Sequence, residues 1–130
     1  GCNSNIHFIG FKNQSEMPVT YRLGDIFVLP SSSETWGLAV NEAMACGRPA
    51  IVSDRVGCAV DLVQPGITGD VFKSDDMEGL KKLLLKYIKE PEKLHLMGKN
   101  AMKLISEWSV EKASAAIAKI VVQNSNEPGV

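Results

Sequence analysis

One stretch limits the possible folds of this sequence more than any other: residues 25–30, which read Asp-Ile-Phe-Val-Leu-Pro. A continuous apolar run that ends at a proline predicts a short strand buried on both faces. Such strands are typical of parallel sheets, because the connecting helices cover both sides of the sheet. Weaker strand patterns occur at residues 6–9, 50–52 and 70–72, with helical patterns between them. The sequence therefore predicts an α/β fold, a three-layer α/β/α sandwich around a parallel sheet.

Helical patterns fill the spaces between the strands and most of the last third of the chain. They are expected over residues 15–23, 37–46, 77–89, 91–107 and 109–123. Ser15 is the expected N-cap of the first helix, and Gly24 and Gly47 are expected to end the first two helices. We expect residues 1–123 to form one domain and the polar residues 124–130 to form a disordered tail.

Composition and charge argue against several classes of function. The formal net charge is −1 and the basic residues are scattered, so no nucleic-acid-binding surface is expected. No apolar run approaches the about 20 residues of a membrane-spanning helix, and no signal-peptide pattern is present. Cys2, Cys46 and Cys58 form no C-x-x-C pair and are expected to be reduced thiols of a cytoplasmic protein. His7 and His95 have no neighbouring ligands, so no metal site is expected.

The functional prediction begins at the end of the longest predicted strand. A serine-rich loop follows that strand, and a helix begins near Gly37. The first N–H groups of a helix have no internal acceptor and lie at the positive end of its dipole, so they bind phosphate readily. In a parallel sheet the loops after Ile9, Leu29 and Val52 share the carboxyl edge, where ligands bind. We expect Gly37 to leave room for a ligand to approach the backbone.

Two acids bracket this helix start: Glu34 in the loop and Glu42 inside the helix. The neighbours of Glu42 are mostly apolar, which is typical of a buried helix, and a buried carboxylate needs hydrogen-bond donors. The vicinal hydroxyls of a sugar or ribose are suitable, because a carboxylate accepts two such bonds as a fork. A plainer interpretation stays open, in which Glu42 and Asn41 form a narrow solvated stripe and Glu34 is an exposed loop acid.

The segment from Glu34 to Pro49 resembles the signature of retaining glycosyltransferases of the GT-B fold. It reads Glu-Thr-Trp-Gly-Leu-Ala-Val-Asn-Glu-Ala-Met-Ala-Cys-Gly-Arg-Pro. It is similar in particular to group 1 (family 4), which includes sucrose synthases and bacterial mannosyl- and glucosyltransferases. Further segments resemble the family in the same order, at residues 7–11, 21–30, 49–54 and 66–69. The resemblance implies a Rossmann-like domain, the C-terminal, donor-binding half of a GT-B enzyme.

The resemblance also implies a role for each matching position. Glu34 would contact the donor sugar near its reacting carbon, and Glu42 would bind the ribose hydroxyls. The main chain at the helix start would hold the diphosphate and sugar hydroxyls, through Trp36, Gly37, Leu38 and Ala39. The first loop would lie against the nucleobase, through Gly10, Phe11 and Lys12. For Phe11 an ordinary core position stays open. Trp36 stands where the family more often has Phe, and either packs the loop or shapes the sugar pocket.

The implied reaction transfers a sugar from a UDP- or GDP-sugar to an acceptor hydroxyl, with retention at the anomeric carbon. No metal and no cofactor take part in the family's usual scheme. The family's catalytic Arg and Lys and its acceptor-binding domain lie upstream of the matching segment. We therefore expect this chain alone to be inactive, to bind the donor weakly, and to self-associate through the surface that the missing domain would cover. We expect such an enzyme in the cytoplasm or at the cytoplasmic face of the inner membrane.

One departure from the family and two alternatives remain. After Gly57 the family often has a second Gly and then a Glu, where this chain has Cys-Ala-Val-Asp at residues 58–61. No role is therefore assigned to the loop over residues 54–61. The alternatives are a non-catalytic module that kept the fold as a scaffold or regulatory binder, and a nucleotide-sugar epimerase of the same architecture. The Glu-x-Trp-Gly-Leu run argues against the epimerase.

Overall fold

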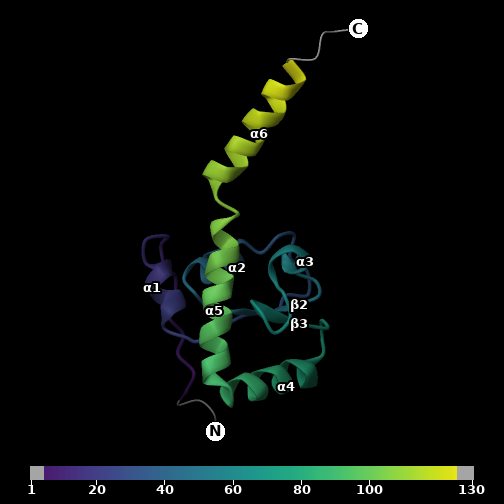
Figure 1. Cartoon of the computed structure of the whole chain (residues 1–130). Coiled ribbons are helices and arrows are strands. Elements are labelled where there is room, and N and C mark those ends of the chain that lie inside the picture. Colours follow the sequence, from purple (N-terminus) through teal and green to yellow (C-terminus); the bar gives the residue numbers. More distant parts are fainter. Residues whose placement is uncertain (1–4, 126–130) are drawn as a thin grey trace.

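The computed structural model of the chain describes residues 5–125, in which short strands alternate with helices (Figure 1). The elements are, in order, α1 (Met17–Arg22), β1 (Phe27–Leu29), α2 (Leu38–Ala45), β2 (Ala50–Ser53), α3 (Ala59–Leu62), β3 (Gly69–Phe72), α4 (Met77–Ile88), α5 (Pro91–Ser106) and α6 (Val110–Ser125). The predicted tail lies mostly outside the described residues, and its first two residues, Asn124 and Ser125, belong to α6.

The strands form a parallel sheet in the order β1-β2-β3, as the apolar run predicted. Val28 pairs with Ile51, and Ile51 pairs with Asp70. Every residue of the central strand β2 is buried, whereas β1 is half-buried along its length. Among the described residues β1 has a strand on one side only, which leaves its outer edge unpaired.

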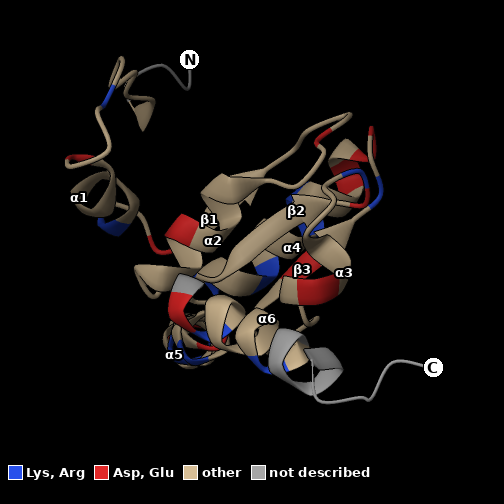
Figure 2. Cartoon of the chain, turned by 90° about the horizontal axis from the view of Figure 1, so that it is seen from above, with Lys and Arg blue, Asp and Glu red and all other residues tan. Residues whose placement is uncertain are grey.

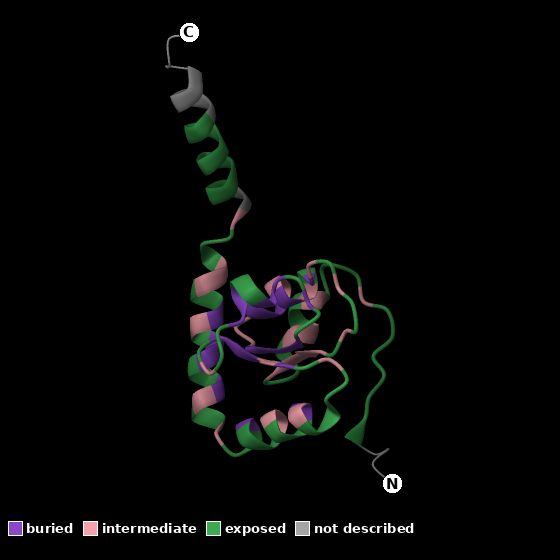
Figure 3. Ribbon diagram, turned by 90° about the vertical axis from the view of Figure 1, so that its right-hand side faces the viewer, coloured by how far each residue is buried: buried purple, intermediate pink, exposed green. Residues whose placement is uncertain are grey.

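Helices cover both faces of the sheet and complete the three-layer sandwich (Figure 3). On one face α2 and α3 pack against the strands, around Val40, Met44, Val52 and Leu62. On the other face α4 covers the sheet, around Ile51, Phe72, Leu80 and Tyr87. Helix α5 contributes to both cores, with Ala101 in the first and Met97 in the second.

The packing of α5 against the end of α2 depends on two glycines. A Cβ atom at Gly98 would lie 2.2 Å from the carbonyl oxygen of Gly47, so the two backbones touch directly. Gly47 has φ +75°, which ends α2 in the left-handed conformation as predicted. Beyond α5 the chain turns, and α6 projects away from the body with its described side chains exposed (Figures 1 and 3).

Three details of the predicted elements were wrong. Residues 6–9 form no strand: they precede α1 as exposed, irregular chain, and a strand needs a neighbour with which to pair. Ser15 does not cap α1; instead the Asn13 side chain accepts from the Glu16 N–H over 3.0 Å. Helix α3 was not predicted, because a helix of 4 residues is too short to show periodicity.

Candidate functional site

The start of α2 follows the carboxyl end of β1 and is partly exposed: Leu38 is exposed and Ala39 is half-buried, whereas Gly37 is buried. Gly37 occupies the N-cap with φ +96°, and no side chain caps the helix. The Val40 N–H donates to the Gly37 carbonyl over 2.8 Å. The N–H groups of Leu38 and Ala39 have no acceptor among the described residues, and Leu38 is 65% exposed. The structure therefore presents free backbone donors where the sequence predicted an anion site.

The loop that carries Glu34 is paired with the loop that follows β2. The Glu34 N–H donates to the Arg55 carbonyl over 3.1 Å, and the Gly57 N–H donates to the Glu34 carbonyl over 2.9 Å. A Cβ atom at Gly57 would lie 1.9 Å from the Thr35 carbonyl oxygen, so only glycine fits there. The loop over residues 54–61, to which the sequence assigned no role, thus fixes the backbone of Glu34.

Gly37 is required for a different reason from the one predicted. A Cβ atom there would lie 2.9 Å from Cγ1 of Val56 and 3.4 Å from the Cys58 sulfur, so it would point into the protein. The prediction that Gly37 makes room for a ligand was therefore wrong; its left-handed φ and the buried packing behind it require glycine. Burial also raises the pKa of the Cys58 thiol, which stays neutral beneath the helix start.

The Glu34 side chain turns back toward the helix start. It is half-buried, and its Oε1 accepts from the Trp36 N–H over 3.4 Å. The Trp36 indole N–H donates to the Asn41 side chain over 2.9 Å, and its ring lies 5.9 Å from that of Trp108, between α5 and α6. Of the two interpretations of Trp36, packing of the loop fits the structure. Sequence reasoning missed Trp108, which follows the end of a helix and carries no motif.

The side chain of Glu42, on α2, faces α1 and does not form part of a solvated stripe. It is half-buried, and its Oε2 accepts from the Tyr21 hydroxyl over 2.7 Å. The side-chain oxygen of the neighbouring Asn41 already accepts the hydrogen bond from the Trp36 indole. A groove of about 230 Å³ opens beside Glu42, lined by Gln14, Met17, Pro18, Tyr21, Glu42, Ala45 and Cys46. Glu34 does not line this groove, so the two acids lie on different parts of the surface around α2.

The predicted base-binding residues lie apart from the start of α2. Gly10, Phe11 and Lys12 belong to the segment before α1, which Figure 2 shows beyond α1 and away from the sheet. Phe11 is 93% exposed, so it has no core position here. Lys12 lies 3.7 Å from Glu16, on the same segment. The structure thus brings together the predicted residues from Glu34 to Glu42 and leaves residues 10–12 separate.

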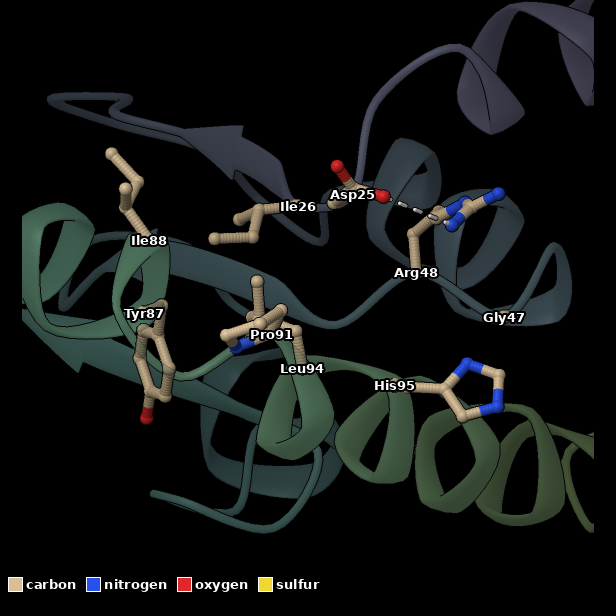
Figure 4. Close-up of a pocket in the computed structure, with 9 residues that line it drawn as sticks. All are labelled: Asp25, Ile26, Gly47, Arg48, Tyr87, Ile88, Pro91, Leu94 and His95. Atoms are coloured by element: carbon tan, nitrogen blue, oxygen red, sulfur yellow. Dashed lines mark ion pairs between the residues drawn. The ribbon is translucent and has the colours of Figure 1, made fainter.

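A larger groove of about 390 Å³ lies at the opposite end of the sheet (Figure 4). It is lined by Asp25 and Arg48, which precede β1 and β2, and by residues at the corner between α4 and α5. Arg48 lies 3.9 Å from Asp25 there. Parallel sheets bind ligands beyond the carboxyl ends of their strands, and this groove is at the amino ends. Its size alone does not make it the predicted site.

Other predictions concern metals, thiols and membranes. Within residues 5–125, no three His, Cys, Asp or Glu side chains are grouped closely enough to hold a metal ion. Cys46 and Cys58 are free thiols, and Cys2 lies outside the described residues. Of the helices that the structure describes, none has the length and apolar character needed to cross a membrane.

The parallel sheet, its two helical layers and the open start of α2 define the class of protein: a Rossmann-like α/β domain of the GT-B type. The particular family follows from the sequence. The chain belongs to the glycosyl transferases group 1, whose family model matches residues 1–104.

Relatives of this family cover nearly all of the chain. A sulfoquinovosyl transferase from Arabidopsis thaliana is 34% identical over 113 residues, which are 85% of this chain and 22% of the relative. A lipopolysaccharide core biosynthesis mannosyltransferase from Rhizobium leguminosarum is 31% identical over 121 residues, 92% of this chain and 34% of the relative. The chain thus spans between a fifth and about a third of the length of these relatives.

Solved structures show the same fold. Sucrose-phosphate synthase from Thermosynechococcus elongatus superimposes with a TM-score of 0.84 at 26% identity, over 96% of this chain and 31% of that one. HepE from Anabaena, in complex with UDP, superimposes with a TM-score of 0.83 at 24% identity, over 93% of this chain and 33% of that one.

Proposed function

We propose that this chain is the donor-binding part of a retaining hexosyltransferase, which moves a sugar from a nucleotide diphosphate to an acceptor hydroxyl. The observation that carries the proposal is the uncapped, partly exposed start of α2, between Glu34 and Glu42, where the described residues offer no acceptor to the N–H groups of Leu38 and Ala39. The names of the relatives support transfer of a sugar, since they include a mannosyltransferase and a sulfoquinovosyl transferase. The HepE structures with UDP and UDP-glucose support a nucleotide-sugar donor.

The proposed chemistry at the helix start is stabilisation of the leaving diphosphate. Negative charge develops on the diphosphate as the bond to the sugar breaks. The N–H groups of Leu38 and Ala39 are already oriented by α2, so they can bind that charge without reorganising, which lowers the barrier. Glu34 would bind the donor sugar near its reacting carbon, in place of its present contact with the Trp36 N–H.

Glu42 and the first loop would bind the nucleoside. Among the described residues only Oε2 of Glu42 has a hydrogen-bond partner, so Oε1 is left for a ribose hydroxyl. Gly10 and Phe11 are exposed and Lys12 is half-buried, so this segment is available for the nucleobase, which would lie between it and α2. The bound nucleotide would thus bridge two parts of the chain that are separate in this structure.

The remaining parts of the proposed enzyme lie outside this chain. Because the chain spans about a third of its relatives or less, we assign the acceptor site and the catalytic Arg and Lys to the remainder of a longer protein. The chain by itself would then be inactive and bind the donor weakly. We propose that the enzyme works in the cytoplasm.

The test uses the longer enzyme that contains this chain. It is incubated with UDP-, GDP- and ADP-sugars, and nucleotide release is measured together with the anomeric configuration of the product. Glu34→Ala should abolish release, whereas Glu92→Ala, an exposed acid on α5, should not change it. Equal release by wild type and Glu34→Ala, or none from any donor, would contradict the enzyme. Nucleotide binding without release would favour the non-catalytic module.

The site itself is tested on the isolated chain by nuclear magnetic resonance. On titration with UDP or GDP, the amide signals of residues 10–12 and 34–42 should shift. Shifts confined to residues around Arg48 and His95, which line the groove in Figure 4, would place the nucleotide at the wrong end of the sheet and reject the assignment.

A further inference from the structure

One hydrogen bond joins the predicted site to α1, an element to which the sequence gave no function. The Tyr21 hydroxyl donates to Oε2 of Glu42 over 2.7 Å, across 21 positions of sequence. The Tyr21 ring packs edge-on against Phe27 of β1, with 5.5 Å between centroids and 82° between ring planes. The phenol is therefore held by the sheet, and its hydroxyl holds one oxygen of the Glu42 carboxylate.

Tyr21 remains a donor at any pH at which an enzyme of this kind works. Burial raises the pKa of its phenol above the ordinary value, and the hydrogen bond and negative charge of Glu42 raise it further. The hydroxyl thus keeps its proton and cannot repel the carboxylate. No other side chain among the described residues bonds to Glu42, so Tyr21 alone sets the orientation of that carboxylate.

We propose that Tyr21 is a positioning residue that holds Glu42 with one carboxylate oxygen free for the vicinal hydroxyls of a ribose. This inference rests on the proposed function, which gives Glu42 the ribose. A glutamate side chain otherwise samples several rotamers, and a ligand must immobilise it at a cost in affinity. Orientation before binding removes that cost, which corresponds to about a five- to tenfold gain in affinity.

The chain offers a matched control for this residue. Tyr87 also donates its hydroxyl to a carboxylate, that of Asp70, in the buried core beneath α4. Tyr87→Phe therefore makes the same chemical change as Tyr21→Phe, at a position away from the start of α2. A general loss of stability would follow from either substitution, whereas an effect on ribose recognition would follow from Tyr21→Phe alone.

The experiment measures the affinity of the chain for UDP and for 2′-deoxy-UDP by amide-detected titration, with GDP and its 2′-deoxy form as the second pair. Tyr21→Phe should weaken ribonucleotide binding about five- to tenfold. It should change binding of the deoxynucleotide less than twofold, because that ligand lacks one hydroxyl of the diol. In a Glu42→Gln background, Tyr21→Phe should have no further effect. Tyr87→Phe should leave both affinities unchanged.

Different outcomes overturn the inference and the proposed function. Three outcomes would overturn the positioning role alone. They are an equal loss of affinity for the ribonucleotide and the deoxynucleotide, an undiminished effect of Tyr21→Phe in the Glu42→Gln background, and no effect of Tyr21→Phe at all. If wild type binds neither UDP nor GDP, the ribose site is absent and the proposed function fails first.

A second measurement needs no substitution, in case Tyr21→Phe does not fold. The sequence holds 2 tyrosines, so 3-fluorotyrosine labelling gives one signal for Tyr21 and one for Tyr87. UDP should shift the Tyr21 signal, and 2′-deoxy-UDP at equal occupancy should shift it less. Equal shifts for the two nucleotides, or a shift at Tyr87 only, would overturn the positioning role.

Discussion

Replacing Gly37 with alanine is expected to lower the free energy of unfolding by about 3 kcal/mol. Two effects add. Gly37 has φ +96°, and a left-handed backbone costs an L-residue with a side chain about 1–2 kcal/mol. The new Cβ would also lie 2.9 Å from Cγ1 of Val56, which is buried and has little room to move, and such overpacking costs about 1–3 kcal/mol.

Two other glycines separate these effects. Gly66 has φ +73° with nothing within 4 Å of its hypothetical Cβ, so Gly66→Ala should show the backbone cost alone, about 1–2 kcal/mol. At Gly24 a Cβ would lie 3.6 Å from the Ile26 carbonyl oxygen and φ is not left-handed. Gly24→Ala should therefore be neutral, or stabilising by about 0.5 kcal/mol through the unfolded state.

The assay is urea unfolding of the three variants and wild type, followed by circular dichroism at one pH and temperature. The expected order of destabilisation is Gly37→Ala, then Gly66→Ala, then Gly24→Ala. If Gly37→Ala proved no less stable than Gly66→Ala, the contact with Val56 would not matter and the packing argument would be refuted. If Gly37→Ala kept full stability, both the backbone argument and the packing argument would be refuted.

Three further predictions concern binding, pH and association. Glu42→Gln should weaken UDP or GDP binding about tenfold or more, because charge-assisted hydrogen bonds are lost, and the exposed Glu92→Gln should have no effect in the same titration; equal losses would contradict this. Burial and the Asp70 carboxylate raise the pKa of Tyr87 in the folded chain. In the unfolded chain Tyr87 deprotonates at about pH 10, its ordinary value, while the folded residue stays neutral, so the free energy of unfolding falls as the pH rises above that value. Urea unfolding from pH 8 to pH 11 should show a shallower alkaline loss for Tyr87→Phe, whereas parallel profiles would contradict the linkage. The isolated chain should self-associate in sedimentation as its concentration rises, since large apolar side chains such as Leu38 are exposed; a single monomer at every concentration would refute this.

The elements with strong local patterns could be predicted from the sequence. The apolar run at residues 25–30 gave β1, and the glycines at both ends gave the limits of α2. The last three helices were within a few residues of the predicted bounds, because their apolar periodicity is long. In these segments the local sequence and the tertiary environment favour the same structure.

The segment before α1 could not be predicted in this way. Residues 6–9 have strand-forming side chains, but a strand is stable only when another strand pairs with it. In the described part of the chain only β2 lies beside β1, and the segment at residues 6–9 is away from both. Propensity is local information, whereas strand pairing depends on distant chain.

The residues of the candidate site stand in a sequence motif, whereas the contacts that hold them follow only from the tertiary structure. Glu34 and Glu42 stand in a spaced motif, so the sequence could suggest them. Tyr21 lies in a segment that resembles the family, but its hydrogen bond to Glu42 on another helix does not follow from that resemblance. Trp108, which packs on Trp36 from beyond the end of α5, stands in no motif. Such contacts are set by the tertiary fold and leave no periodic trace in the sequence.

Under the proposed function, the parallel pairing of the loops after β1 and β2 has a consequence for the choice of donor sugar. Glu34 is held by main-chain bonds to Arg55 and Gly57, so its place follows the shape of that second loop. A substitution in that loop would displace the Glu34 carboxylate without altering any group that we propose to contact the donor. Inherited differences in sugar preference among related chains should therefore be sought in residues 54–58 as well as in the residues that line the donor pocket.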